Sequence, residues 1–176
     1  VLDVRRGGER PAGAGTARVE GERDRPEGDR PAAEDEAALL GRERCSAILR
    51  TPIASAAAPA MEAAVRGGFR IVEFTLTIPN AFDRIAEFAK RDLVVGAGTV
   101  LTPDDARQAV KAGASYLVSP VVDEAVIRTA ADLGFAMLPG AFTPTEMLRA
   151  HRAGAPLVKL FPAPHDPPTY LRQVLG

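Results

Sequence analysis

The residues from Cys45 to Gly176 predict an α/β fold in which parallel strands alternate with helices. Apolar runs of strand length recur along this region, a helical pattern separates each run from the next, and the turns between them are short. The six runs start near Ala47, Ile71, Val94, Tyr116, Ala136 and Leu157. This rhythm is typical of a (β/α)8 TIM barrel, of which about six βα units are present. An open doubly wound sheet is less favoured, because Gly96-Ala97-Gly98-Thr99 lacks the third glycine of a dinucleotide-binding turn.

The composition predicts one domain and argues against some classes of binding partner. With 176 residues, 46% of them hydrophobic, the chain can bury one core, which we assign to residues 45–176 as a partial barrel. A net charge of -1 argues against nucleic acid or an anionic membrane as a partner. A single cysteine, Cys45, excludes an internal disulfide, and no apolar run approaches a membrane span. We therefore expect a soluble cytoplasmic protein.

Residues 1–44 differ from the rest of the chain. They are rich in Gly, Pro, Arg, Glu and Asp and show no sustained apolar periodicity. Such a segment buries too little apolar surface to offset the entropy of ordering it. We expect a disordered or low-order extension, with a possible short helix from Glu34 to Arg44 that leads into the domain.

The first half of the domain alternates short strands and helices. Thr51-Pro52 ends the first strand, and Gly67-Gly68 ends the first helix. The expected elements are a strand at Ala47–Arg50, a helix at Pro59–Arg66, a strand at Arg70–Leu76, a helix that starts at Pro79, and a strand at Leu93–Ala97.

The second half carries two strong helix starts. Thr102 and Thr143 are each followed by a proline and, three residues later, by an acid, which predicts an N-cap, a proline at the first helical position and a capping box. The other expected elements are a strand at Tyr116–Val118, a helix at Asp123–Asp132, a strand at Ala136–Leu138, a strand at Leu157–Leu160 and a helix at Thr169–Leu175.

An internal repeat relates three helix-to-strand junctions. Each junction has a basic helix end, a glycine, a turn and an apolar strand, at residues 66–73, 111–118 and 152–159. The last position of the repeat is Glu73, Val118 and Lys159 in turn. A shared register places Glu73 and Lys159 at matching depths near the carboxyl ends of their strands, the end at which barrels carry their chemistry.

Lys159 lies within the apolar run Leu157–Phe161 and needs an explanation. It could extend to solvent from a strand end, or it could form a buried structural pair with Glu73. Alternatively, its neutral amine could attack a ketone, while Glu73 carries protons during dehydration and C–C cleavage. The residues alone leave these alternatives open.

Other polar residues gather at the same strand ends. Thr77 lies on the side of Glu73 by strand alternation, and Thr99 follows the glycines 96 and 98, which we interpret as a turn with room for a ligand. Ser119-Pro120 closes the fourth strand. The two histidines, His151 and His165, have no acidic partners at ligand spacing, so no metal site is expected.

Four stretches resemble, in order and spacing, the signature motifs of the KDPG/KHG aldolase family. They are Val72-Glu73-Phe74-Thr75-Leu76-Thr77, Gly96-Ala97-Gly98-Thr99-Val100-Leu101, Val118-Ser119-Pro120 and Val158-Lys159-Leu160-Phe161-Pro162-Ala163. The resemblance implies a class I aldolase with a (β/α)8 barrel and no cofactor. Such enzymes are usually trimeric and split 2-keto-3-deoxy-6-phosphogluconate into pyruvate and glyceraldehyde 3-phosphate.

The same resemblance implies roles for individual residues. Lys159 matches the Schiff-base lysine and Glu73 the general acid/base, whereas Thr99, Pro120 and Phe161 match the residues of the pyruvate pocket. Thr77 stands where the best-known members carry an arginine that contacts the substrate carboxylate or phosphate, and Arg50 is a candidate substitute.

The length of the chain is a second departure from the family. The sequence stops at Gly176, before a seventh and eighth strand, so we expect a C-terminally truncated, open barrel with exposed edges at Ala47–Arg50 and Leu157–Phe161. The expected partners are a small 2-keto acid substrate and, for a complete enzyme, two further copies in a homotrimer. Two alternatives stay open: an aldolase for a related 2-keto-3-deoxy or 4-hydroxy-2-oxo acid, and a non-catalytic fragment or binding protein.

Overall fold

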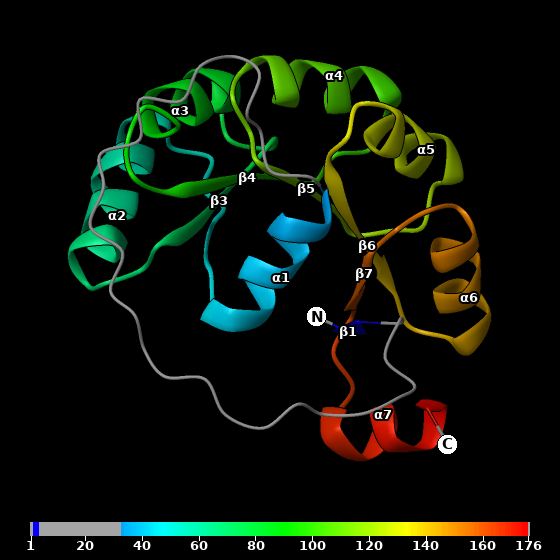
Figure 1. Cartoon of the computed structure of the whole chain (residues 1–176). Helices are drawn as coiled ribbons and strands as arrows, with labels where there is room; N and C mark the ends of the chain where they lie inside the picture. Colours follow the sequence, from blue (N-terminus) through cyan, green and yellow to red (C-terminus); the bar gives the residue numbers. More distant parts are fainter. Residues whose placement is uncertain (1, 4–32, 176) are drawn as a thin grey trace.

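The computed structural model describes residues 2–3 and 33–175, and its centre is a curved sheet flanked by helices (Figure 1). The strands are β1 (Leu2–Asp3), β2 (Ala47–Leu49), β3 (Ile71–Thr75), β4 (Val94–Gly98), β5 (Tyr116–Ser119), β6 (Ala136–Ala141) and β7 (Leu157–Leu160). The helices are α1 (Ala33–Glu43), α2 (Ala54–Arg66), α3 (Ala81–Phe88), α4 (Pro103–Lys111), α5 (Glu124–Asp132), α6 (Pro144–Arg152) and α7 (Pro167–Leu175). From β2 to β7 each strand pairs in parallel with the next, which confirms the six predicted βα units.

The helix starts follow the predicted capping chemistry where the caps are strong. Thr102 caps α4 and Thr143 caps α6, each in a capping box with the acid three residues later. Asp123, expected as the first residue of α5, is its N-cap, and its side chain accepts hydrogen bonds from the backbone of Ala125 and Val126.

Two helix starts differ from the prediction. The helix expected at Pro59 begins at Ala54, because the alanine-rich run before the proline favours helix strongly and buries Ala57 completely. The helix expected at Pro79 begins at Ala81, because Asn80 has a φ of 59°, a left-handed conformation that a helix cannot include.

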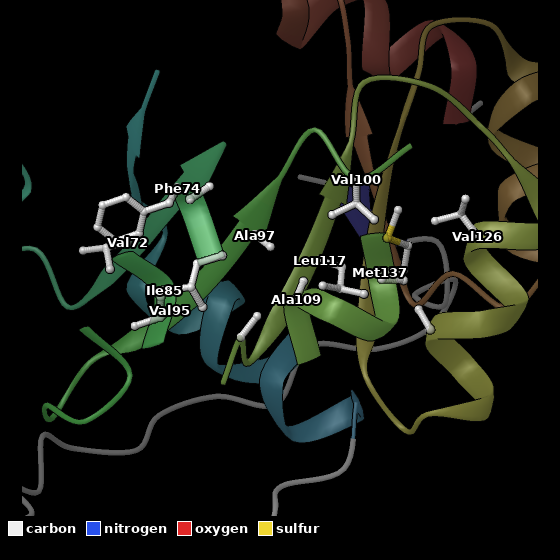
Figure 2. Packing of buried hydrophobic residues seen from close by; sticks show 14 of the residues in the cluster. Val72, Phe74, Ile85, Val95, Ala97, Val100, Ala109, Leu117, Val126 and Met137 are labelled. Atoms are coloured by element: carbon white, nitrogen blue, oxygen red, sulfur yellow. The ribbon is translucent and has the colours of Figure 1, made fainter. Parts of the chain in front are cut away.

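The sheet separates two apolar layers by strand alternation. The outer layer packs Val72, Phe74, Val95 and Ala97 against helix residues such as Ile85, and Figure 2 shows this packing. Helices α2 to α6 cover this convex side of the sheet (Figure 1). The intervening strand residues therefore face the concave side, as expected for the interior of a barrel.

Helix α1 lies on the concave side of the sheet (Figure 1). Its Leu40 packs against a second cluster of inward-facing residues, Ile71, Tyr116, Val118, Ala136, Leu138 and Leu157. Four of these are the first residues of their strands, so α1 covers the amino end of the interior and leaves the carboxyl end for the site. The helix expected at Glu34–Arg44 is confirmed as α1, whereas the disorder expected for residues 4–32 falls outside the described residues.

The sheet order is β1-β7-β6-β5-β4-β3-β2. The outer edge of β2 has no strand beside it among the described residues, as predicted. The prediction of an exposed edge at Leu157–Phe161 is wrong for Leu157 and Val158, because β1 pairs antiparallel with β7 there, Leu2 with Val158 and Asp3 with Leu157. The free backbone groups of an edge strand accept any extended segment that reaches them. Within the described part of the chain, no helix is long and apolar enough to cross a membrane.

Candidate active site

Glu73 on β3 and Lys159 on β7 both face the interior of the sheet. Glu73 alternates with the inward-facing Ile71, and Lys159 alternates with the inward-facing Leu157. In the hydrogen-bonded register, Glu73 aligns through Gly96 and Tyr116 with Ala136, whereas Lys159 aligns with Gly140. On β6 the residues aligned with Glu73 and with Lys159 are therefore four positions apart, at Ala136 and Gly140. Strand β7 is the fourth strand after β3. Tilted strands in a barrel of shear 8 shift by about one residue per strand, so the two side chains lie at similar depth.

The carboxyl group of Glu73 is buried, with 4% of the residue exposed. Burial raises its pKa from 4.5 to about 7, against the attraction of Lys159 and Arg50, which lowers it. Near neutral pH such a group is partly protonated and can both give and accept a proton.

Lys159 is half-buried at the carboxyl end of β7. Its Nζ lies 4.7 Å from the ring centroid of Phe161, and its charge acts on Glu73. Among the described residues, however, Lys159 takes part in no ion pair or hydrogen bond of its side chain. The amine therefore lies near Glu73 without being held in the buried structural pair that the sequence left open.

Two glycines of β4 make room for side chains of the neighbouring strands. A Cβ at Gly98 would overlap the carboxyl of Glu73, and a Cβ at Gly96 would overlap the ring of Tyr116. The interpretation of these glycines as a turn with room for a ligand is therefore wrong. They are strand residues, and the space they leave is occupied by the protein itself.

Arg50 and Thr99 meet at the carboxyl ends of β2 and β4. Arg50 Nη2 donates a hydrogen bond to Thr99 Oγ1 at 3.0 Å, and the charge of Arg50 also acts on Glu73. Thr99 has a φ of 63°, a left-handed conformation that is uncommon for a β-branched residue. Strained backbone of this kind often occurs where a side chain is aimed at a ligand.

Pro120 follows the carboxyl end of β5, and Phe161 follows the carboxyl end of β7. Both line a hollow of about 310 Å³, whose other residues are Val121, Val122, Gly140, Phe142, Glu146, Arg149 and Pro162. Phe161 is 43% exposed although it is large and apolar. The ring of Phe161 thus lies between the lysine amine and a hollow that neither Lys159 nor Glu73 lines.

Most of the residues that the sequence singled out converge, but not all. Thr77 lies in an exposed turn after β3, where its hydroxyl is 2.9 Å from that of Thr75. The sequence reasoning did not select Tyr116 as part of the site, and it assigned Gly98 to ligand space rather than to the space that Glu73 fills. The signal that could have found them is a pair of glycines at alternate, inward-facing strand positions beside a bulky residue on the next strand.

Comparisons with known proteins identify relatives of this chain. A model of the KDPG and KHG aldolase family matches residues 38–167. The probable 2-dehydro-3-deoxy-6-phosphogalactonate aldolase of Rhizobium meliloti (strain 1021) is 41% identical over 120 residues, which are 66% of this chain and 57% of that protein. The chain spans about half the length of the curated relatives it matches.

Solved structures give the same family. The 2-keto-3-deoxy-6-phosphogluconate aldolase of Zymomonas mobilis ZM4, solved with 3-phosphoglycerate, superposes with a TM-score of 0.73 at 28% identity, over 82% of this chain and 70% of that one. The KDPG aldolase of Legionella pneumophila, solved with pyruvate captured as a covalent carbinolamine intermediate, superposes with a TM-score of 0.62 at 28% identity, over 67% of this chain and 58% of that one. The family match over residues 38–167, together with these folds, shows that the chain belongs to the KDPG and KHG aldolase family.

Proposed function

We propose that this protein is a class I aldolase, a carbon–carbon lyase that forms a Schiff base between Lys159 and a 2-keto acid. The observation that carries the proposal is the placement, on one inner face, of a lysine amine with no ion-pair partner among the described residues and a buried glutamate whose pKa is about 7. The carbinolamine captured in the Legionella pneumophila relative supports the same chemistry. No cofactor is required, because the iminium itself supplies the electron sink.

The proposed reaction begins with attack of the neutral Lys159 amine on the keto carbon. A C–N bond forms, the carbonyl oxygen takes a proton from Glu73 directly or through a water, and loss of water leaves an iminium. The C3–C4 bond then breaks, its electrons pass to the iminium nitrogen as an enamine forms, and Glu73 removes the proton of the C4 hydroxyl. Protonation of the enamine at C3 and hydrolysis release pyruvate and free the lysine.

The proposed substrate is 2-keto-3-deoxy-6-phosphogluconate, which is split to pyruvate and glyceraldehyde 3-phosphate. The Zymomonas mobilis enzyme, named for this substrate, supports the assignment. A second candidate is the 2-dehydro-3-deoxy-6-phosphogalactonate named in the Rhizobium meliloti relative. Cleavage rates on both compounds, and on 4-hydroxy-2-oxoglutarate, would separate the three possibilities. We further propose, on the sequence resemblance, that the enzyme works as a homotrimer in the cytoplasm.

The test of the proposed function is to trap the Schiff base. Pyruvate and borohydride should add one reduced pyruvate to Lys159, located by peptide mass spectrometry. The sequence has three lysines, so Lys90 and Lys111 serve as internal controls. Lys159→Arg should abolish the adduct and Lys111→Arg should leave it intact. A folded chain without an adduct at Lys159 would support the non-catalytic alternative.

Arg50 is the proposed partner of the substrate carboxylate, in place of the arginine that Thr77 replaces. Its guanidinium donates a hydrogen bond to Thr99, and its positive charge lowers the pKa of Glu73. Arg50→Ala should weaken the apparent affinity for pyruvate in the trapping assay by about tenfold, which corresponds to one charge-assisted hydrogen bond. Arg66→Ala, at the last residue of α2, is the matched control. An unchanged pyruvate dependence would remove Arg50 from the site.

A further inference from the structure

Tyr116 is a fully buried ionisable residue that the proposed reaction does not use. It begins β5 and is 1% exposed. Burial first, and then the charge of Glu73, raise the pKa of its phenol well above the usual range, so the ring stays neutral. A neutral phenol inside a barrel costs free energy unless its hydroxyl finds a partner.

The side chain of Tyr116 extends across β4 to β3. Its ring occupies the space over Gly96 that a Cβ would fill. Its hydroxyl donates a long hydrogen bond, 3.4 Å, to the carbonyl of Val72, and the nearby side chain of Ser46 lowers the pKa of the phenol against the effect of burial. Val72 immediately precedes Glu73, so the phenol is anchored to the peptide unit that carries the proposed acid/base.

The ring of Tyr116 and the carboxyl of Glu73 both lie over β4, the ring at Gly96 and the carboxyl at Gly98. Glu73 and Tyr116 both align with Gly96 in the sheet, and the carboxyl turns toward Gly98, at the carboxyl end. The aromatic ring therefore lies on the amino-end side of the carboxyl, toward the cluster that Leu40 of α1 covers. The charged and titratable groups that act on Glu73 are Lys159 from β7, Arg50 after β2 and the neutral Tyr116.

We propose that Tyr116 is a positioning residue for Glu73. Its ring excludes water from the side of the carboxyl that faces the amino ends of the strands, and its hydroxyl holds the ring against β3. The inference rests on the proposed function for its catalytic meaning, but its physical claim concerns the environment of Glu73 alone. It predicts that removing the ring admits water and lowers the pKa of Glu73 toward that of an exposed glutamate.

The test measures the Glu73 titration by carboxyl ¹³C NMR, with the signal assigned by its absence in Glu73→Gln. Tyr116→Ala should lower the pKa of Glu73 by about one unit or more, because it replaces the ring with space for water. Tyr116→Phe should keep the pKa within about half a unit, because it keeps the ring and removes only the hydroxyl. The acid limb of the pH profile for pyruvate trapping should move with the NMR value.

Leu117→Ala is the matched control. Leu117 is the next residue of β5, is fully buried and packs in the outer layer. This variant therefore weakens the core but leaves the ring beside the Glu73 carboxyl in place. If Tyr116→Ala does not fold, Tyr116→Leu takes its place with the same expected fall, because leucine cannot reach β3. An unchanged Glu73 titration in the folded variant, or an equal shift in Leu117→Ala, would overturn the proposal. If the wild-type protein traps no pyruvate but the Glu73 pKa still falls in Tyr116→Ala, only the proposed function is refuted.

Discussion

At the scale of single residues, the site depends on side chains that are absent as much as on those that are present. Gly98 has no Cβ, and the carboxyl of Glu73 occupies the space beside it. Gly96 has none either, and there the ring of Tyr116 fills the gap. The two glycines differ in what a larger residue would displace, since a carboxyl end can rotate whereas a packed ring between strands cannot.

Gly98→Ala should therefore separate folding from function. The new methyl group forces the Glu73 carboxyl aside, and we expect a fall of about 100-fold in the rate of pyruvate trapping, the lower range for loss of a general acid/base. The stability loss should stay near 1 kcal/mol, at the low end for overpacking, because the flexible end of one side chain absorbs the clash. Urea denaturation and the trapping rate measure the two effects.

Gly41→Ala is the matched control for this substitution. Gly41 lies inside α1, and nothing comes within 4 Å of a Cβ at that position. Alanine there should leave trapping unchanged and should stabilise the helix by roughly 0.5–1 kcal/mol. If Gly98→Ala traps pyruvate at the wild-type rate, the contact of Glu73 with Gly98 has no role in its proposed chemistry.

At the scale of elements, capping chemistry determines where α4 and α6 begin. Thr143 Oγ1 accepts from the backbone of Glu146, whose carboxylate accepts in return from the backbone of Phe142 and Thr143. These hydrogen bonds hold the pKa of Glu146 below its usual value. The capped helix follows β6 directly, so the same hydrogen bonds hold the loop of Phe142, which stacks on Tyr170 of α7.

Thr143→Ala should destabilise the protein by about 1 kcal/mol, the usual cost of losing an N-cap side chain. Thr145→Ala removes the same hydroxyl from the same helix, where no described residue bonds to it, and should change stability by less than about 0.5 kcal/mol. Urea midpoints of the two variants against wild type test this difference. Equal effects would show that the cap contributes nothing beyond local helix propensity.

At the scale of the whole molecule, one buried acid links folding to pH. The pKa of Glu73 is raised from 4.5 to about 7 in the folded state, so the folded protein binds this proton more tightly than the unfolded chain. The resulting stabilisation is fully present below pH 4.5 and is lost as the pH rises to about 7. A shift of this size corresponds to about 3 kcal/mol.

The wild-type protein should therefore lose about 3 kcal/mol more stability between pH 4.5 and pH 7 than Glu73→Gln, which has no proton to release. Denaturant unfolding of both proteins across this range provides the measurement. The difference between them isolates Glu73 from the other titrating groups. Parallel stability curves would mean that the carboxyl is far better solvated than its burial indicates.

The sequence alone determined the local structure and selected Glu73 and Lys159 as the proposed reactive pair. Strand periodicity, the capped starts at Thr102 and Thr143, and the glycine-ended repeats predicted six βα units, because each of these signals depends on neighbours along the chain. The repeat also placed Glu73 and Lys159 at corresponding positions, and the sheet register agrees with that placement. Where local signals were weak, at Pro59 and Pro79, the predicted boundaries were wrong.

Only the tertiary structure decided what surrounds the pair. The space left by Gly96 and Gly98, the reach of Tyr116 to β3, the contact of Arg50 with Thr99 and the pairing of β1 with β7 all join residues far apart in sequence. Burial and the pKa of Glu73 follow from those contacts, since desolvation depends on what lies around a group in space. The sequence pattern can indicate which residues act as acid and base. Their protonation depends on neighbouring strands that come together only when the chain folds.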